Sequence, residues 1–170
     1  MIAATHSFRT KNVKPQALSL ASKLMHIGAD REYIIERLYR TKTLATLKLW
    51  GQALNHLEHR QDLGLVSTLL TREDFIRSGA SEYDLYDIID ELIANSPEAK
   101  MILLLHESIK ENDQESIYGI LQTQNGFNAK EFLSHLNAAG DKRQATFVIK
   151  NKTLKQVESE IIAEIEKNHD

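Results

Sequence analysis

Two short polar segments of this chain combine the residue types that hold phosphate groups in proteins. In the first, "THSFRT", the hydroxyl groups of Thr5 and Ser7 and the guanidinium of Arg9 directly follow an apolar run. Hydroxyl and guanidinium groups at the carboxyl end of a strand are typical of phosphate sites in α/β proteins. The sequence therefore predicts that residues 5–9 end a strand and can contact an anionic ligand.

The second segment, "NAAGDKRQATF", places Gly140 before the adjacent cations Lys142 and Arg143, just ahead of a predicted strand. The backbone N–H groups of such a loop, together with two cations, can hold one phosphate. A helix C-cap explains the same residues equally well, because glycine ends helices and basic side chains complement the helix dipole. From the residues alone, both interpretations stay open.

Two further groups of residues could do chemistry. His56 and His59 are three apart on a predicted helix, so they could share a face and bind a divalent metal. We favour polar surface histidines, because no third ligand follows at a recognisable spacing. The neighbouring carboxylates Asp87, Asp90 and Glu91 could do acid–base work, but between apolar residues they are more typical of the solvated face of an amphipathic helix.

The overall composition restricts the class of protein. The 170 residues are 42% hydrophobic, carry a net charge of −3 and include no cysteine. Disulfides and thiolate metal sites are therefore excluded, and any site for a polyanion must be local. No apolar run reaches the roughly 18 residues that a membrane span needs, and the first residues do not resemble a signal peptide. We expect a cytoplasmic protein with no membrane partner.

The hydrophobic periodicity changes near residues 60–64. Before this point it predicts three helices; after it, strands alternate with helices. The expected helices lie at residues 15–28, 31–40, 41–59, 71–95, 128–140 and 153–167. The expected strands lie at residues 62–70, 99–108, 116–124 and 144–150. This order predicts a mixed α/β (α+β) fold, in which an N-terminal helical segment precedes a mixed sheet of about four strands with helices packed on one face.

Three segments of the sequence resemble DHH-family phosphoesterases of the oligoribonuclease and 3′-phosphoadenosine phosphatase type. "IAATHSFRTKNVKPQAL" resembles the last motif of the family's catalytic domain, and "LYRTKTLATLKLWGQAL" is similar to the linker helix that follows it. "LLTREDFIRSGASEYDLYDIIDELIANSPEAKMILLL" resembles the start of the DHH-associated C-terminal domain. The resemblance implies three parts: a remnant of the catalytic domain at residues 1–10, linker helices at 11–60 and a substrate-binding domain at 61–170.

The resemblance also implies that the metal centre is absent. The family's metal-binding motifs precede the part that this chain resembles, and Ala4 stands where the last motif has a metal-binding Asp. A methyl group cannot coordinate Mn²⁺ or Mg²⁺, which require oxygen ligands. We therefore expect no catalytic residues, no metal site and no cofactor in this chain, although Mn²⁺ or Mg²⁺ is expected for the complete family enzyme.

The family's substrate-binding residues are only partly retained. Its Gly-Gly-Gly-His loop, which holds phosphate, corresponds here to Ala138–Asp141, so an aspartate replaces the histidine. An Arg-Ser or Arg-Thr pair of the family corresponds to Gln122 and Thr123. Hydrogen bonds to charged groups contribute about 1.5–3 kcal/mol each, so these exchanges predict weakened binding of phosphate. The resemblance implies the following phosphate- or nucleic-acid-binding residues: Gly140, Asp141, Lys142, Arg143, Gln122 and Thr123.

Three functions follow from this combination. The first is a module that binds short RNA, DNA or nucleotides weakly and is inactive alone. The second is one half of a split phosphoesterase, in which another chain supplies the catalytic domain. The third is an interaction or scaffold protein that self-associates through the apolar residues Leu18, Leu24, Ile34 and Leu38 of its N-terminal helices.

Overall fold

The computed structural model describes residues 13–39, 42–85, 88–89, 99–113, 115–124 and 126–168. The chain divides into two compact units, residues 1–43 and residues 44–170. No helix in the described ranges is both long enough and apolar enough to cross a membrane.

The first unit contains two helices, and local sequence signals set their limits. Helix α1 (Pro15–His26) begins with Pro15 in its first turn, where the missing N–H costs no helical hydrogen bond. Gly28 follows the helix with a positive φ of 96°, a conformation that glycine adopts without strain. Helix α2 (Arg31–Tyr39) begins after Asp30, whose carboxylate accepts a hydrogen bond of 2.9 Å from the Tyr33 N–H. These two predicted helices are confirmed.

The second unit is built on a mixed six-stranded sheet in the order β1-β2-β3-β4-β6-β5. Only β2 and β3 run parallel; all other neighbours are antiparallel. The long connection between β2 and β3 carries helix α4, as a parallel crossover requires. The strands are β1 (Glu58–Arg60), β2 (Leu65–Leu70), β3 (Met101–Glu107), β4 (Ser116–Thr123), β5 (Ala139–Gly140) and β6 (Gln144–Lys150). The four predicted strands are confirmed, and the short edge strands β1 and β5 were not predicted.

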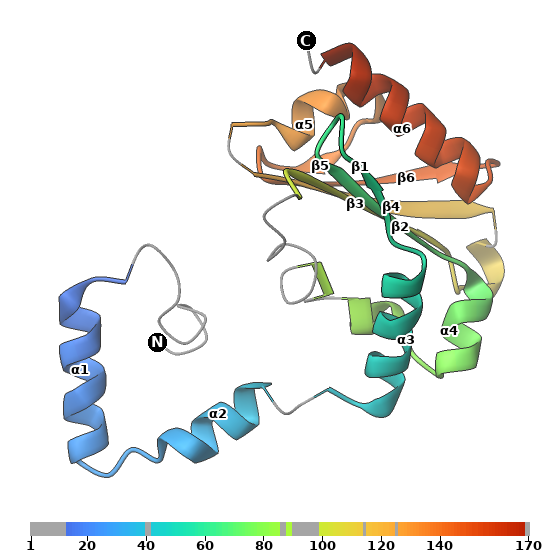
Figure 1. The fold of residues 1–170 in the computed structure, drawn as a ribbon. Helices are drawn as coiled ribbons and strands as arrows, with labels where there is room; N and C mark the ends of the chain where they lie inside the picture. Colours follow the sequence, from blue (N-terminus) through green and yellow to red (C-terminus); the bar gives the residue numbers. More distant parts are fainter. Residues whose placement is uncertain are drawn as a thin grey trace. The chain divides into compact units, whose positions relative to one another are not determined.

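Helices cover both faces of the sheet, so the expectation that they cover one face is wrong (Figure 1). Alternate residues of β3 explain why. Met101, Leu103 and Leu105 belong to the core cluster that includes residues of α5 (Ala129–Phe132) and α6 (Leu154–Asn168). Ile102 and Leu104 belong to the cluster beneath α3 (Leu44–Asn55) and α4 (Arg72–Ser78). A strand covered on both faces reads as one continuous apolar run, and "MILLL" is such a run.

The cover that α3 and α4 provide on the second face of the sheet is incomplete. Along β6, burial alternates strictly, so that Ala145, Phe147 and Ile149 are buried while Gln144, Thr146 and Val148 are exposed. The buried set packs in the cluster with α5 and α6. In the described residues, the second face of β6 is therefore exposed, and that of β4 is only partly covered, with Ile120 packed against the second cluster.

Three predicted helices differ from the structure. The helix expected at 41–59 ends at Asn55, and residues 58–60 form β1. The helix expected at 128–140 is interrupted: α5 ends at Phe132, a 3₁₀ turn follows at Ser134–Leu136, and Asn137 takes a left-handed conformation. The helix expected from Thr71 begins there with a capping box and ends at Ser78, because Gly79, like Asn137, takes a left-handed conformation. A 3₁₀ turn follows at Glu82–Leu85. A residue with positive φ cannot continue a right-handed helix.

Gly119 tests the packing of the central strands. It pairs with Phe147 across β4 and β6, and a Cβ on Gly119 would overlap with the Phe147 ring, which is buried. We expect Gly119→Ala to lower the free energy of unfolding by about 1–3 kcal/mol, because the packed ring must shift. Urea unfolding of Gly119→Ala, Phe147→Leu and the double variant measures this. The cost of the alanine should be smaller when Phe147→Leu is also present; equal costs with and without that second substitution would contradict the explanation.

Candidate nucleotide-binding cleft

Gly140 lies in a tight hairpin between β5 and β6. Gly140 pairs with Ala145, and the Asp141 N–H donates a hydrogen bond of 2.8 Å to the Gln144 carbonyl. The φ of Gly140 is 132°, and a Cβ there would overlap with the Gln144 carbonyl oxygen. Only glycine fits this position. The helix C-cap interpretation of this segment is therefore wrong, because Gly140 belongs to a strand and the preceding helical turn ends at Leu136.

The end of β4 holds this hairpin in place. The Thr123 N–H donates 2.7 Å to the Arg143 carbonyl. The Thr123 hydroxyl lies 2.8 Å from the Lys142 carbonyl and 3.0 Å from the Phe127 carbonyl. Its single hydrogen can be donated to either of these two acceptors. The Ala129 N–H also donates to the Lys142 carbonyl, at 2.9 Å. The backbone of both basic residues is thus fixed, while their side chains point outward and are exposed.

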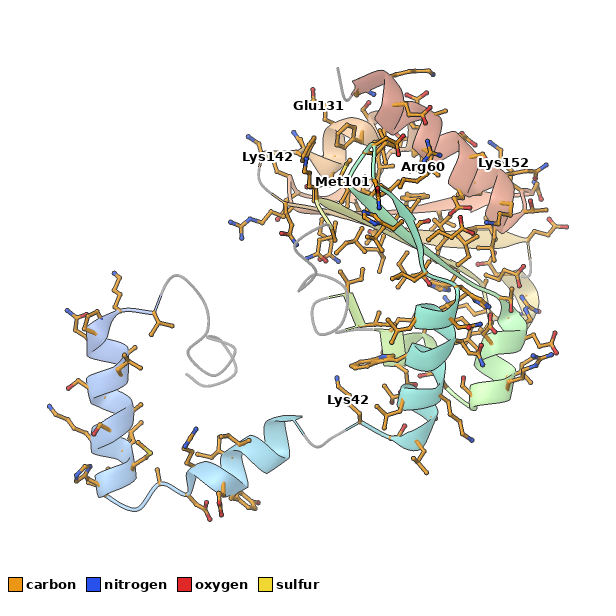
Figure 2. All side chains as sticks on the ribbon, viewed as in Figure 1. Lys42, Arg60, Met101, Glu131, Lys142 and Lys152 are labelled. Atoms are coloured by element: carbon orange, nitrogen blue, oxygen red, sulfur yellow. The ribbon has the colours of Figure 1, made fainter. Side chains whose placement is uncertain are left out.

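Four of the six predicted binding residues line one cleft. It has a volume of about 750 Å³, and Lys142 lies at the same end of the unit as Glu131 (Figure 2). The residues that line it are Gln122, Thr123, Gln124, Gly126, Phe127, Asn128, Glu131, Lys142 and Arg143. The other two, Gly140 and Asp141, line an adjoining hollow of about 450 Å³ together with Lys142.

Asp141 occupies the backbone donors of the hairpin. Its Oδ1 accepts hydrogen bonds from the N–H groups of Arg143 (2.7 Å) and Gln144 (3.1 Å). These backbone hydrogen bonds, first that of Arg143, hold the pKa of Asp141 below its usual value. The sequence predicted an anion here that repels phosphate, and the structure adds that this carboxylate binds N–H groups that would otherwise face a ligand.

The charges of the cleft nearly balance. In the described part of the chain, neither Lys142 nor Arg143 has a carboxylate within ion-pair distance. Glu131 lines the same cleft, and Asp141 lines the adjoining hollow. Lys130 also lines the adjoining hollow, so three cations act beside two carboxylates, and all five are exposed to solvent, where each charge contributes little.

Asn128 is a residue of the cleft that sequence reasoning missed. It precedes α5 but makes no capping hydrogen bond with its side chain. Its Oδ1 is buried without a hydrogen-bond partner, and the residue lines both the cleft and the adjoining hollow. A buried unpaired acceptor costs free energy unless a donor reaches it. The only signal at this position in the sequence is an Asn at the start of a predicted helix. That pattern indicates a helix N-cap, not a ligand-binding residue.

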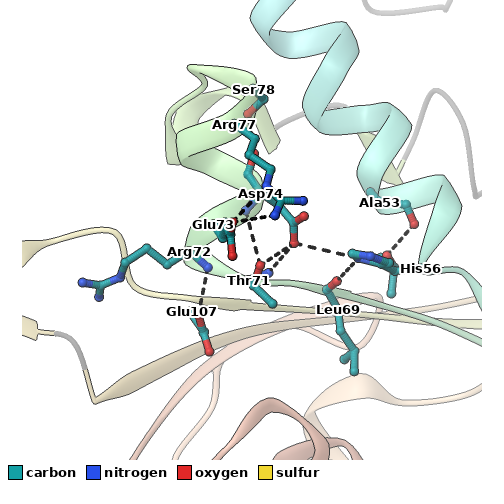
Figure 3. A network of polar contacts seen from close by, with 11 residues as sticks. Ala53, His56, Leu69, Thr71, Arg72, Glu73, Asp74, Arg77, Ser78 and Glu107 are labelled. Carbon is teal, nitrogen blue, oxygen red and sulfur yellow. Dashed lines mark hydrogen bonds and ion pairs between the residues drawn. The ribbon is translucent and has the colours of Figure 1, made fainter.

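The two histidines proposed as a metal pair do not share a helix. His56 follows α3, and His59 lies in β1 and is exposed. Nδ1 of His56 bonds to the Leu69 carbonyl at 2.8 Å and lies 3.9 Å from Asp74 (Figure 3). Asp74 itself closes the capping box of α4 by accepting from the Thr71 N–H and hydroxyl. Among the described residues, no group of three or more His, Asp or Glu side chains is arranged to hold a metal ion.

Several residues singled out in the sequence lie outside the described ranges. These are Ala4, Thr5, Ser7, Arg9, Asp87, Asp90 and Glu91.

Solved structures are similar to this chain over nearly its whole length. An exopolyphosphatase-related protein from Bacteroides fragilis matches 98% of the chain, with a TM-score of 0.82 and 17% identity, and is itself covered over 47%. The pGpG-specific phosphodiesterase PggH from Vibrio cholerae matches 97%, with a TM-score of 0.55 and 16% identity, and is covered over 55%. RecJ in complex with Mg²⁺ from Thermus thermophilus matches 93% of the chain with 15% identity, but the TM-score is 0.36 and 21% of RecJ is covered.

The first two matches show that this chain shares its fold with an exopolyphosphatase-related protein and a pGpG-specific phosphodiesterase. This chain spans about half the length of the first two neighbours. No protein-family model matches the sequence, and no curated protein is significantly similar to it.

The Asp141 hydrogen bonds make a prediction about pH. Because the folded pKa of Asp141 is lowered, its charge stabilises the hairpin above the pKa of the unfolded chain. This contribution is lost as pH falls through the lower, folded pKa. Asp141→Asn keeps an acceptor but removes the charge, so wild type should be more stable than this variant at pH 7, and the difference should disappear at low pH. Thermal unfolding between pH 2 and pH 7 measures it; a difference that does not change with pH would contradict the assignment.

Proposed function

We propose that this chain is the nucleotide- or nucleic-acid-binding C-terminal module of a DHH-type phosphoesterase, without a metal centre of its own. The observation that carries the proposal is the convergence of Gln122, Lys142 and Arg143 on one cleft from two strand ends that are distant in the sequence. The backbone beneath the two cations is fixed by Thr123, so only their side chains must be ordered when a ligand binds. The DHH-superfamily-like fold agrees with a nucleotide-related role.

The balance of charges sets the expected strength of binding. The chain carries a net charge of −3, so no long-range field attracts an anionic strand. Asp141 and Glu131 also oppose the two cations locally. We therefore propose weak binding of short single strands or nucleotides, dependent on salt because each phosphate contact releases counterions.

Removal of the two cations tests the proposal. Lys142→Ala/Arg143→Ala should weaken binding of a fluorescently labelled tetraribonucleotide by about three- to thirtyfold and flatten its salt dependence. Fluorescence anisotropy at several salt concentrations gives both quantities. Lys150→Ala/Lys152→Ala removes the same charge from two exposed lysines that line neither hollow, and should change little. Equal losses in both double variants, or no salt-dependent binding by wild type, would refute the proposed function.

Asp141 provides a variant with the opposite effect. Asp141→Asn keeps an acceptor for the N–H groups of Arg143 and Gln144 but removes a negative charge beside Lys142. It should strengthen tetraribonucleotide binding by about two- to fivefold. An unchanged or weaker affinity, in a variant that is folded at the temperature of the measurement, would contradict an anionic ligand at this hairpin.

A second candidate is one half of a split phosphoesterase. The first two neighbours are about twice as long as this chain, and the described residues contain no metal-ligand cluster. In this case a separate chain supplies the two-metal chemistry that hydrolysis in this class requires. The purified chain with Mn²⁺ should then hydrolyse no dinucleotide above the buffer rate; turnover that co-purifies with the chain and stops with a chelator would overturn the inactive-alone prediction.

The apolar residues of α1 favour an interaction role as well. Within the first unit α1 has no buried residue, and Leu18 and Leu24 are 50% and 40% exposed. We propose that this face binds a second copy of the chain or a catalytic-domain chain, since exposed apolar faces of this kind commonly mark interfaces. The side chain of Leu38, which the sequence assigned to the same surface, lies outside the described set.

A further inference from the structure

A second hollow lies on the uncovered face of the sheet, next to the cleft. It has a volume of about 730 Å³, and its floor is formed by the residues of β4 and β6 that alternate with the core. The floor consists of Tyr118, Ile120, Gln122, Gln144, Thr146 and Val148. Leu136, Asn137 and Ala139 line one wall, and Glu82, Leu85 and Ile89 line another. We call it the sheet-face pocket.

The pocket contains a fixed aromatic surface. His106 and Tyr118 are paired across β3 and β4, and their rings stack with centroids 5.4 Å apart and an interplanar angle of 11°. The Tyr118 hydroxyl donates 2.8 Å to Asp113, which raises the pKa of Tyr118. Burial lowers the pKa of His106, so its imidazole is neutral near pH 7. Because His106 is buried, a planar group in the pocket meets mainly the Tyr118 ring, over which Lys110 Nζ also lies, 5.5 Å from the ring centroid.

Glu82 provides an unsatisfied acceptor in the same pocket. Its Oε1 is buried and has no hydrogen-bond partner. Glu82 lines the pocket together with His106 and Tyr118, so its carboxyl group lies near both rings. A buried carboxylate oxygen without a donor is costly. The site thus favours a ligand that brings N–H donors to a pocket lined by both apolar and polar side chains.

The two hollows share a wall. Gln122 lines both the sheet-face pocket and the cleft, and the adjacent hairpin residues Arg143 and Gln144 line one hollow each. A ligand with a flat group in one hollow and an anionic group in the other therefore meets complementary chemistry at both ends. A nucleotide has this composition.

We propose that the sheet-face pocket binds a guanine base through Glu82, beside the phosphate cleft; its coupling to phosphate rests on the proposed function. Guanine presents two adjacent donors, N1–H and N2–H₂, which match the two oxygens of a carboxylate. Adenine and cytosine each offer a single amino group beside an acceptor, and uracil offers one N–H. A carboxylate that recognises both guanine donors binds guanine selectively, because the other bases leave one oxygen unpaired.

Phosphate-free nucleosides separate this proposal from the proposed function. Guanosine should bind wild type more tightly than adenosine by about tenfold or more, measured by NMR shifts of the Tyr118 and His106 ring protons. Glu82→Gln should remove this preference. Glu115→Gln, an exposed carboxylate outside both hollows, should keep it. Lys142→Ala/Arg143→Ala should leave guanosine binding unchanged while it weakens binding of guanosine monophosphate.

The outcomes are distinct. If tetraribonucleotide binding depends on Lys142 and Arg143 but guanosine and adenosine bind equally or not at all, the base site is refuted and the proposed function survives. If guanosine binds selectively but no phosphate-dependent binding exists, the proposed function is refuted and the base site stands. Thr146→Trp fills the pocket from an exposed position on β6, so it should abolish guanosine binding even if Glu82→Gln fails to fold; persistent binding would overturn the location.

Discussion

The hydrogen bonds from Thr123 to the β5–β6 hairpin are the constraint on which both hollows depend. Thr123 is 4% exposed, and its N–H and hydroxyl hold the carbonyl groups of Arg143 and Lys142. Because the N–H and hydroxyl of Thr123 both form internal hydrogen bonds, Thr123 contributes to the cleft by holding the hairpin in position. The hairpin in turn forms one side of the cleft and, through Gln144, part of the floor of the sheet-face pocket.

Uneven cover of the sheet explains why a hollow lies over the second face of β4 and β6. The strands β2 and β3 are covered on both faces, so most of their apolar side chains belong to the core. The strands β4 and β6 are packed on one face by the cluster with α5 and α6, and their other face carries polar and small apolar groups. The same antiparallel register therefore gives stability on one side and a surface for a ligand on the other.

The sequence was sufficient wherever the pattern is local. The hydrophobic periodicity predicted the four long strands, including β3 and β6, and the start of α4 near Thr71. The sequence was insufficient where one pattern fits two structures: Gly140 with two cations describes both a helix end and a hairpin. The choice depends on the partner strand, because the close approach of Gln144 decides it.

The candidate binding residues also divide into those that the sequence predicted and those that it did not. Gln122, Lys142 and Arg143 were predicted because a family resemblance marked them, and the structure brings them to one cleft. Asn128, Glu82 and the His106–Tyr118 stack were not predicted as a site. Their importance arises from register and from burial of single atoms, which one sequence does not reveal.

The charges of the hairpin show why a second hollow matters for binding. A phosphate that approaches the backbone of residues 141–144 competes with Asp141 for the N–H groups of Arg143 and Gln144. The two cations offset this only partly, because Glu131 and Asp141 lie beside them and solvent screens all four groups. Electrostatics alone therefore provides little net affinity and almost no selectivity between anions. The base site that we propose in the sheet-face pocket would supply both, since burial of a base adds affinity and the donor pattern distinguishes one base from another.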